Sequence, residues 1–148
     1  MKQLIFFTDN SWQGLILRLL AGGIMFTHGA QKVLGLFGGY GYTATMRYFT
    51  ETMEFPRLIA FLIIVCEFLC SLLLIAGLAS RLSAIIFIVI MLGAIITTNY
   101  KNGFFMNWFG NQQGEGFEYH LLVIGICAVL LITGSGKFAI DRWITAGH

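Results

Sequence analysis

The chain has 148 residues, of which 57% are hydrophobic and 11% are charged, with one proline, a formal net charge of +2 and a mean hydropathy of +0.81. This composition is far more apolar than that of a soluble domain of similar length, so we expect an integral membrane protein. The small net charge and the lack of a basic block argue against nucleic-acid binding.

The first predicted element is a membrane span at residues 14–34, which carries Arg18, His28, Gln31 and Lys32 within an apolar run. It is about long enough to cross a bilayer. Because ionisable groups inside a span are costly, these side chains should face the interior of a bundle and have partners there. Small residues in the run should let a neighbouring helix approach closely. The run is too long and too polar for a cleaved secretory signal, so we interpret it as retained.

Residues 35–55 are too polar to span, but apolar side chains recur at helical spacing after a glycine-rich start. Charged residues occupy the other side of this pattern. It therefore predicts a short interfacial helix between the first and second spans, covering one end of the bundle. Pro56 then suits the first turn of a new helix.

The second predicted span, residues 57–78, is interrupted near its middle by Glu67. The many apolar residues around it outweigh one buried acid, so insertion is still favourable. Glu67 nevertheless needs a partner in the bundle. We expect it to be ionised and to form a structural pair with Arg18, with His28 or Lys32 as the competing partner.

The third and fourth predicted spans are residues 82–100 and 117–133. Between them lies a stretch rich in aromatic, glycine and amide residues, 99–116, which includes Trp108 and Phe109. Aromatic residues gather at membrane interfaces, so this stretch is typical of an interfacial anchor. A platform for a ligand is the alternative.

The three cysteines, Cys66, Cys70 and Cys127, all lie in apolar runs. Their odd number and apolar surroundings argue against a disulfide framework. Cys66 and Cys70 lie one helical turn apart on one helix, which is poor geometry for a disulfide. We expect small buried thiols there and predict no metal site.

The sequence therefore predicts one all-α integral membrane domain over residues 1–148, a four-transmembrane-helix bundle with a short interfacial helix between spans one and two. Four spans place both termini on one side, and a modest excess of Lys and Arg there favours cytoplasmic termini. With that orientation, four segments contribute polar groups to one level in the outer half of the bundle. These groups are His28, Gln31, Lys32, Asn99, Lys101, Glu118 and His120.

Several short motifs follow one another along the chain. They are His28-Gly29-Ala30-Gln31-Lys32-Val33-Leu34-Gly35, the mid-span Glu67, Gly77-Leu78-Ala79-Ser80-Arg81, Lys101-Asn102-Gly103-Phe104-Phe105, Gly116-Phe117-Glu118-Tyr119 and Gly134-x-Gly-x-x-Ala-Ile-Asp141-Arg142. In order and spacing, over nearly the whole chain, they resemble the DoxX family of small four-helix bacterial membrane proteins.

This resemblance implies a multi-pass bundle in the bacterial cytoplasmic (inner) membrane. It also implies an association with quinone-linked redox chemistry, because the family is named for its similarity to a subunit of a thiosulfate:quinone oxidoreductase. Such an analogy concerns a relative, and the activity has to be argued from the site itself.

Our leading hypothesis is a membrane subunit of a quinone-linked redox system, with a quinone or similar small ligand in the outer half of the bundle. His28 and Lys32 would hydrogen-bond a quinone oxygen, and Glu67 and Glu118 would pass protons. Trp108 or Phe109 would stack on the quinone ring. The chain has no haem, flavin or iron–sulfur motif, so electrons would come from a redox partner protein or a small reductant. The predicted ligand-binding residues are His28, Gln31, Lys32, Asn99, Trp108, Phe109 and His120.

Three alternatives remain open. Arg18, His28 and Lys32 could select anions in a carrier or channel, which in so short a chain would need homo-oligomers. The interfacial helix at residues 43–55 could instead serve a non-catalytic scaffold that assembles partner proteins. His28 and His120 could ligate one haem iron, but two histidines without a supporting pattern disfavour this interpretation.

Overall fold

The computed structural model describes residue 6 and residues 8–146, and this part of the chain is helical and contains no β-strand. The predicted all-α class is thereby confirmed. In chain order the elements are α2 (Trp12–Leu34), α3 (Gly41–Arg47), η1 (Tyr48–Thr52), α4 (Arg57–Ala76), α5 (Ser80–Ala94), η2 (Ile95–Asn99), η3 (Tyr100–Asn102), α6 (Glu118–Thr133) and α7 (Ile140–Ala146).

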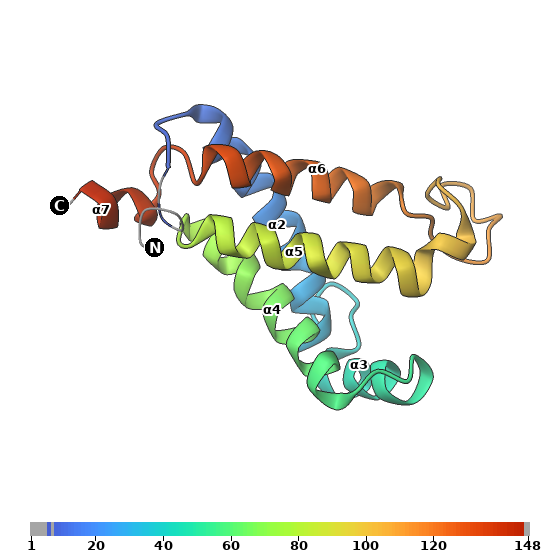
Figure 1. Cartoon of the computed structure of the whole chain (residues 1–148). Helices are drawn as coiled ribbons and strands as arrows, with labels where there is room; N and C mark the ends of the chain where they lie inside the picture. Colours follow the sequence, from blue (N-terminus) through green and yellow to red (C-terminus); the bar gives the residue numbers. More distant parts are fainter. Residues whose placement is uncertain (1–5, 7, 147–148) are drawn as a thin grey trace.

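The four long helices form two pairs that meet at one end. α2 packs most extensively against α4, and α5 packs most extensively against α6. A tight turn at residues 77–79 joins α4 to α5, and these two helices diverge away from it (Figure 1). Buried apolar side chains from all four helices, including Met25, Leu74, Phe87 and Leu130, hold the pairs together. The bundle is therefore narrow at the turn and open at its other end.

Two of the helices within the described residues are long and apolar enough to cross a membrane. They are Arg57–Ala76 and the continuous helical run Ser80–Asn102. The run Glu118–Thr133 is apolar but shorter. α2 has the length to span, yet its polar residues, among them Arg18, His28, Gln31 and Lys32, lower its hydropathy. The helices thus match the four predicted runs to within about two residues.

Glycines on α2 set its close contact with α4. A Cβ atom at Gly29 would lie 2.7 Å from the Cα of Phe68, and one at Gly22 would lie 2.9 Å from a side-chain carbon of Ile75. Such distances are shorter than carbon atoms tolerate, so only glycine fits at both places. The expected close approach through small residues is present, and it brings the polar face of α2 against Glu67.

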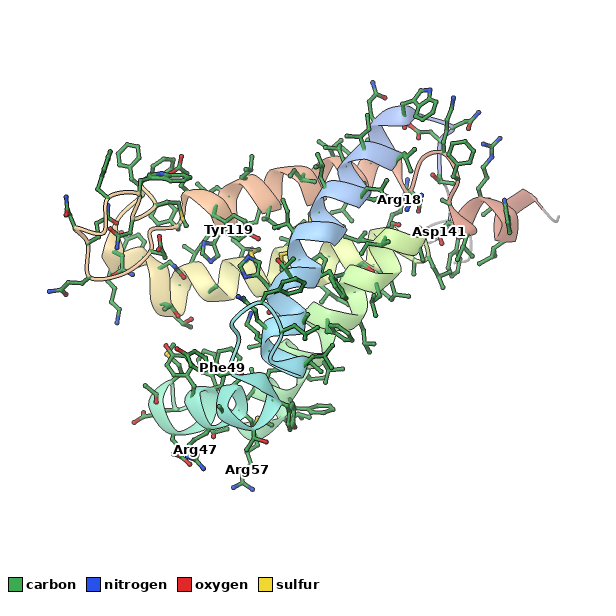
Figure 2. The ribbon with its side chains drawn as sticks, turned by 180° about the vertical axis from the view of Figure 1, so that it is seen from behind. Arg18, Arg47, Phe49, Arg57, Tyr119 and Asp141 are labelled. Carbon is green, nitrogen blue, oxygen red and sulfur yellow. The ribbon has the colours of Figure 1, made fainter. Side chains whose placement is uncertain are left out.

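A short helix lies between α2 and α4, as the sequence predicts. α3 continues directly into the π-helical turn η1, and the segment packs against α2 and α4. Figure 2 shows Arg47 and Arg57 at the outer edge of this region, with their side chains directed away from the bundle. Both are exposed. This segment covers the open end of the α2–α4 pair.

The opposite end, which we call the base, consists of the 77–79 turn, the loop at residues 134–139 and α7. Arg18 lies there and is 2% exposed. Its guanidinium donates five hydrogen bonds of 2.5–3.2 Å to backbone carbonyl oxygens. The acceptors belong to Leu74, Ile75, Ser135, Lys137 and Phe138. Every N–H group of Arg18 is therefore satisfied by the backbone, and none is given to Glu67.

Asp141 completes the base from the start of α7. Its carboxylate accepts hydrogen bonds from the backbone N–H groups of Ala79 and Ser80 and from the Ser135 hydroxyl, at 2.7, 3.2 and 2.5 Å. Both backbone N–H groups are at the start of α5, where helical N–H groups lack intrahelical acceptors. Arg18 and Asp141 lie at the same end of the molecule (Figure 2). Together they attach the C-terminal segment to the α4–α5 turn.

Candidate functional site

The divergence of α4 from α5 leaves an open cavity of about 620 Å³ between the two helix pairs. Its walls come from α2, η1, α4, α5, η2 and the first turn of α6. This volume lies within the usual range of small-molecule sites. The cavity brings together five residues that the sequence singles out, namely His28, Lys32, Glu67, Asn99 and His120.

An ion pair lies in the wall formed by α2 and α4. The ammonium nitrogen of Lys32 is 2.6 and 2.5 Å from the two carboxylate oxygens of Glu67. Glu67 is 2% exposed, whereas the Lys32 side chain is 29% exposed. The expected Arg18–Glu67 pair is therefore wrong, and the competing partner Lys32 holds the acid. The physical reason is at the base, where backbone carbonyls occupy the whole guanidinium of Arg18.

Two imidazoles and a phenol line the cavity beside this pair. The rings of His28 and Tyr119 have centroids 5.6 Å apart, and so do those of Tyr119 and His120. The Tyr119 hydroxyl donates only a long, weak hydrogen bond, 3.5 Å, to the thioether sulfur of Met25. Among the described residues, the buried Nδ1 of His120 has no hydrogen-bond partner. Buried polar atoms are nearly always paired, so this nitrogen is a candidate contact for a ligand.

Both π-helical turns of the described chain border the cavity. η1 contributes Tyr48 and Phe49, and η2 contributes Thr97, Thr98 and Asn99. Such turns are rare in proteins and occur often at functional sites. Their presence on two different walls of one cavity marks it as the candidate site.

The remaining walls are apolar and adaptable. Isoleucine and valine side chains of α4 and α5 face each other across the gap, with aromatic rings from the η1 region at one end. Four methionines also line it: Met25, Met53, Met91 and Met106. Methionine is flexible and polarizable, and its sulfur makes favourable contacts with aromatic rings. The cavity thus combines a polar patch on α2, α4 and α6 with a largely apolar remainder.

Other predicted site residues lie outside this cavity. Trp108 and Phe109 are 76% and 88% exposed and do not line it. Their loop projects beyond the ends of α5 and α6 (Figure 1). The expectation that one of them stacks on a ligand ring in the bundle is therefore wrong, whereas their role as an interfacial anchor stays a prediction. Phe49 provides an aromatic ring in the wall instead.

Glu118 and Gln31 also have structural contacts rather than places in the cavity wall. The Glu118 carboxylate accepts a hydrogen bond from the backbone N–H of Met106, 3.3 Å, and so holds the loop at the start of α6. The side chain of Glu118 turns to the loop and not to the cavity. The expectation that it passes protons to a ligand in the cavity is therefore wrong. Gln31 donates to the Phe37 carbonyl at 3.0 Å and lines a second cavity of about 500 Å³ beneath α3.

Asn99 lies at the rim, where its amide donates to the carbonyl of Glu115 at 2.9 Å. Sequence reasoning missed Tyr119, Phe49 and the four methionines as site residues. Tyr119 directly precedes His120 in the first turn of α6, a position that would have signalled its proximity to that histidine. The methionines carry no such signal, because their convergence depends on how four different segments pack.

A DoxX family model matches residues 14–100, which contain α2, α4 and α5 with His28, Lys32 and Glu67. The chain belongs to the DoxX family. Over 133 residues, this DoxX protein is 33% identical to a protein of Bacillus subtilis (strain 168) named "Putative oxidoreductase CatD". That match covers 90% of the present chain and 87% of the relative. No solved structure matches the chain. DoxX proteins are membrane-associated, in agreement with the two helices that are apolar enough to span.

Proposed function

We propose that this DoxX protein is a membrane subunit of a quinone-linked redox system that binds a quinone-type ligand in the cavity between its two helix pairs. The observation that carries the proposal is the composition of the cavity wall. His28, Tyr119, His120 and the Lys32–Glu67 pair form one polar patch in an otherwise apolar cavity. A quinone has the matching character, an apolar ring with hydrogen-bonding oxygens.

Each group of the polar patch has a distinct capacity. Imidazole and phenol groups can donate a hydrogen bond to a carbonyl oxygen, and the Tyr119 hydroxyl makes only a weak one within the protein. Glu67 and Lys32 place a carboxylate and an ammonium next to each other at the cavity wall, where a proton can be held and passed on. A bound quinone supplies two-electron, two-proton redox chemistry. The residues of the chain bind its oxygen and supply or accept the protons.

The electrons have to come from outside this chain, from a reduced partner protein or a small reductant. The described residues contain no group of three or more His, Cys, Asp or Glu side chains placed to hold a metal ion. The oxidoreductase name of the Bacillus subtilis relative supports a redox role. The proposed topology has four spans in the inner membrane, with the base and both termini on the cytoplasmic side.

The alternative of an anion carrier loses support from the same geometry. Of its three proposed selectivity groups, Arg18 is enclosed by backbone carbonyls at the base and Lys32 is neutralised by Glu67. Only His28 remains, and it is ten residues from Arg18 along α2. These residues do not form a continuous positive path.

Direct titration tests the proposal. The purified protein in lipid nanodiscs is titrated calorimetrically with ubiquinone-1, a benzoquinone with one isoprene unit. We expect saturable binding that weakens about 3- to 10-fold in Tyr119→Phe and in His120→Leu, the loss of roughly one hydrogen bond in each variant. Tyr100→Phe is the matched control, because Tyr100 is exposed and does not line the cavity.

The proposal is overturned if the wild-type protein binds no ubiquinone-1 saturably. Equal affinity in the wild-type, Tyr119→Phe and His120→Leu proteins would also remove the site. Tryptophan fluorescence of the wild-type chain is a poor reporter, because Trp12, Trp108 and Trp143 all lie outside the cavity wall. A Phe49→Trp variant places a reporter in the wall, and we expect its emission to be quenched at the same concentrations.

A further inference from the structure

The polar groups of the cavity lie mainly on α2 and on the first turn of α6, whereas most of its apolar lining comes from α4 and α5. The polar patch belongs to α2, to Glu67 and to the first turn of α6, whereas Ile59 and Ile63 of α4 face Val89 and Gly93 of α5 across the gap. α4 and α5 diverge from the 77–79 turn (Figure 1), and the cavity between them is open. The apolar walls therefore lead from the polar patch to the flank of the bundle.

Gly93 keeps this passage wide. A Cβ atom built at Gly93 has no heavy atom of another part of the chain within 4 Å, so the residue borders open space. This glycine is unlike Gly29, whose Cβ would overlap the neighbouring backbone. Gly93 is also within α5, where glycine is less favourable than alanine in intrinsic helix propensity. Packing does not require a glycine here, and the lack of a side chain at Gly93 leaves this part of the cavity wall unobstructed.

The sides of the passage suit a flexible apolar chain. Three methionines, Met25, Met53 and Met91, contact the cavity together with the branched side chains of α4 and α5. Flexible thioether side chains adapt to an irregular apolar ligand. The outer surfaces of both helices are also apolar, with Leu62 of α4 and Leu92 of α5 exposed. In a membrane these surfaces meet lipid acyl chains, so an apolar chain that leaves the cavity stays in an apolar medium.

From this arrangement we infer that the ligand carries a long apolar tail, enters sideways from the lipid, and leaves its tail in the gap between α4 and α5 beside Gly93. The inference rests on the proposed function and specifies the class of quinone. The ring and its oxygens lie at His28, Tyr119 and His120, and the tail passes Ile63 and Gly93 toward the membrane. Gly93 is then a specificity-determining residue for the tail and makes no contact with the ring.

The test compares a tailless quinone with a tailed one in the full-length protein. Wild-type, Gly93→Leu and Gly125→Leu proteins in lipid nanodiscs are titrated with ubiquinone-0, which has no tail, and with decylubiquinone. Gly125 of α6 is the matched control, because it is also helical, exposed and free of neighbours within 4 Å, but it does not line the cavity. Comparing each variant with the wild type for one quinone cancels the partitioning of that quinone into lipid.

We expect Gly93→Leu to weaken decylubiquinone binding about tenfold, while ubiquinone-0 binding changes less than about twofold. Gly125→Leu should change neither. Equal effects of Gly93→Leu on both quinones, or no effect on either, would overturn the inference and leave the proposed function standing. Binding of ubiquinone-0 without binding of decylubiquinone would also overturn it. If the wild-type protein binds neither quinone, the proposed function itself fails.

A second variant protects the test against misfolding. If Gly93→Leu does not give a folded protein, Val89→Trp introduces bulk one helical turn earlier on the same wall of α5. The same selective loss of decylubiquinone binding is expected. Unchanged decylubiquinone binding in a folded Val89→Trp protein would overturn the inference.

Discussion

Lys32 of α2 and Glu67 of α4 form an ion pair in which one ammonium nitrogen contacts both carboxylate oxygens, at 2.6 and 2.5 Å. The pair joins α2, which carries the imidazole of His28, to α4, which is apolar enough to span a membrane, and it forms part of the cavity wall. A buried carboxylate without a counter-charge is strongly unfavourable. The pair is therefore both a structural contact and the charged element of the candidate site.

Removing one partner of this pair should cost more than removing both. We expect Lys32→Met to lower the free energy of unfolding by about 3–5 kcal/mol, because it leaves a buried charge at Glu67. The double variant Lys32→Met with Glu67→Gln should recover most of that loss. Equilibrium denaturation with SDS in mixed micelles measures these values.

The exposed pair of Arg47 and Glu51 is the control for that series. Its side chains are both 70% exposed and its closest atoms are 3.9 Å apart. Glu51→Gln should change the free energy of unfolding by less than about 0.5 kcal/mol. A double variant that is no more stable than Lys32→Met would contradict the assignment of the pair.

At the base, Arg18 should not be replaceable by lysine. Its five hydrogen bonds reach carbonyls of α4 and of the 134–139 loop in a planar fork that a single ammonium group cannot reproduce. We expect Arg18→Lys to lower the free energy of unfolding by about 3 kcal/mol or more, since several buried carbonyls lose their donors. It should also speed proteolysis within residues 134–146. An Arg18→Lys protein as stable as the wild type would show that the five hydrogen bonds from Arg18 to backbone carbonyls contribute little to stability.

Arg18 also shows where sequence reasoning succeeds and where it fails. That a buried arginine needs several acceptors follows from its position in an apolar run. Its partners could not be predicted, because they are backbone carbonyls, which every residue carries and no motif marks. Glu67, the acid in the middle of the next predicted span, was the partner that the sequence suggested. Instead, Lys32 forms the ion pair with Glu67, because the close contact of α2 with α4 at Gly29 places Lys32 next to this carboxylate.

The Gly29 contact leads to a prediction about packing. A Cβ atom at Gly29 would lie 2.7 and 2.9 Å from backbone atoms of Phe68, which cannot easily move. Gly29→Ala should therefore lower the free energy of unfolding by about 1–3 kcal/mol. Gly125→Ala, where nothing lies within 4 Å, should leave it unchanged or raise it by up to about 1 kcal/mol. Thermal unfolding of the two variants in the same detergent measures the difference, and an equal response of both would contradict the close approach.

Asp141 should behave as a cap for a helix distant in sequence. Asp141→Ala removes the acceptor for the N–H groups of Ala79 and Ser80 at the start of α5 and for the Ser135 hydroxyl. We expect a loss of about 1–2 kcal/mol in the free energy of unfolding, as for other helix caps. Hydrogen–deuterium exchange should rise at residues 79–82. Unchanged exchange there in Asp141→Ala would rule out the capping role.

Much of the fold follows from the sequence because four apolar runs and one amphipathic segment dictate helices of nearly the observed lengths. The site was harder to predict. Histidine, lysine and glutamate stand out in an apolar run, and His28, Lys32, Glu67 and His120 do meet in one cavity. Trp108 and Phe109 stand out equally, yet their loop lies beyond the helix ends. Residue type reveals which side chains are unusual, whereas the angle between α4 and α5 decides which of them share a cavity.

Photolabelling tests the central claim most directly. The full-length protein in lipid nanodiscs is irradiated with an aryl-azide benzoquinone, digested and analysed by mass spectrometry, with and without excess ubiquinone-2. We predict competed labelling on peptides that contain His28, Glu67 or Tyr119 and His120, which line the cavity. Labelling confined to the exposed loop around Trp108 and Phe109, or labelling that ubiquinone-2 does not reduce, would contradict a quinone site between the helix pairs.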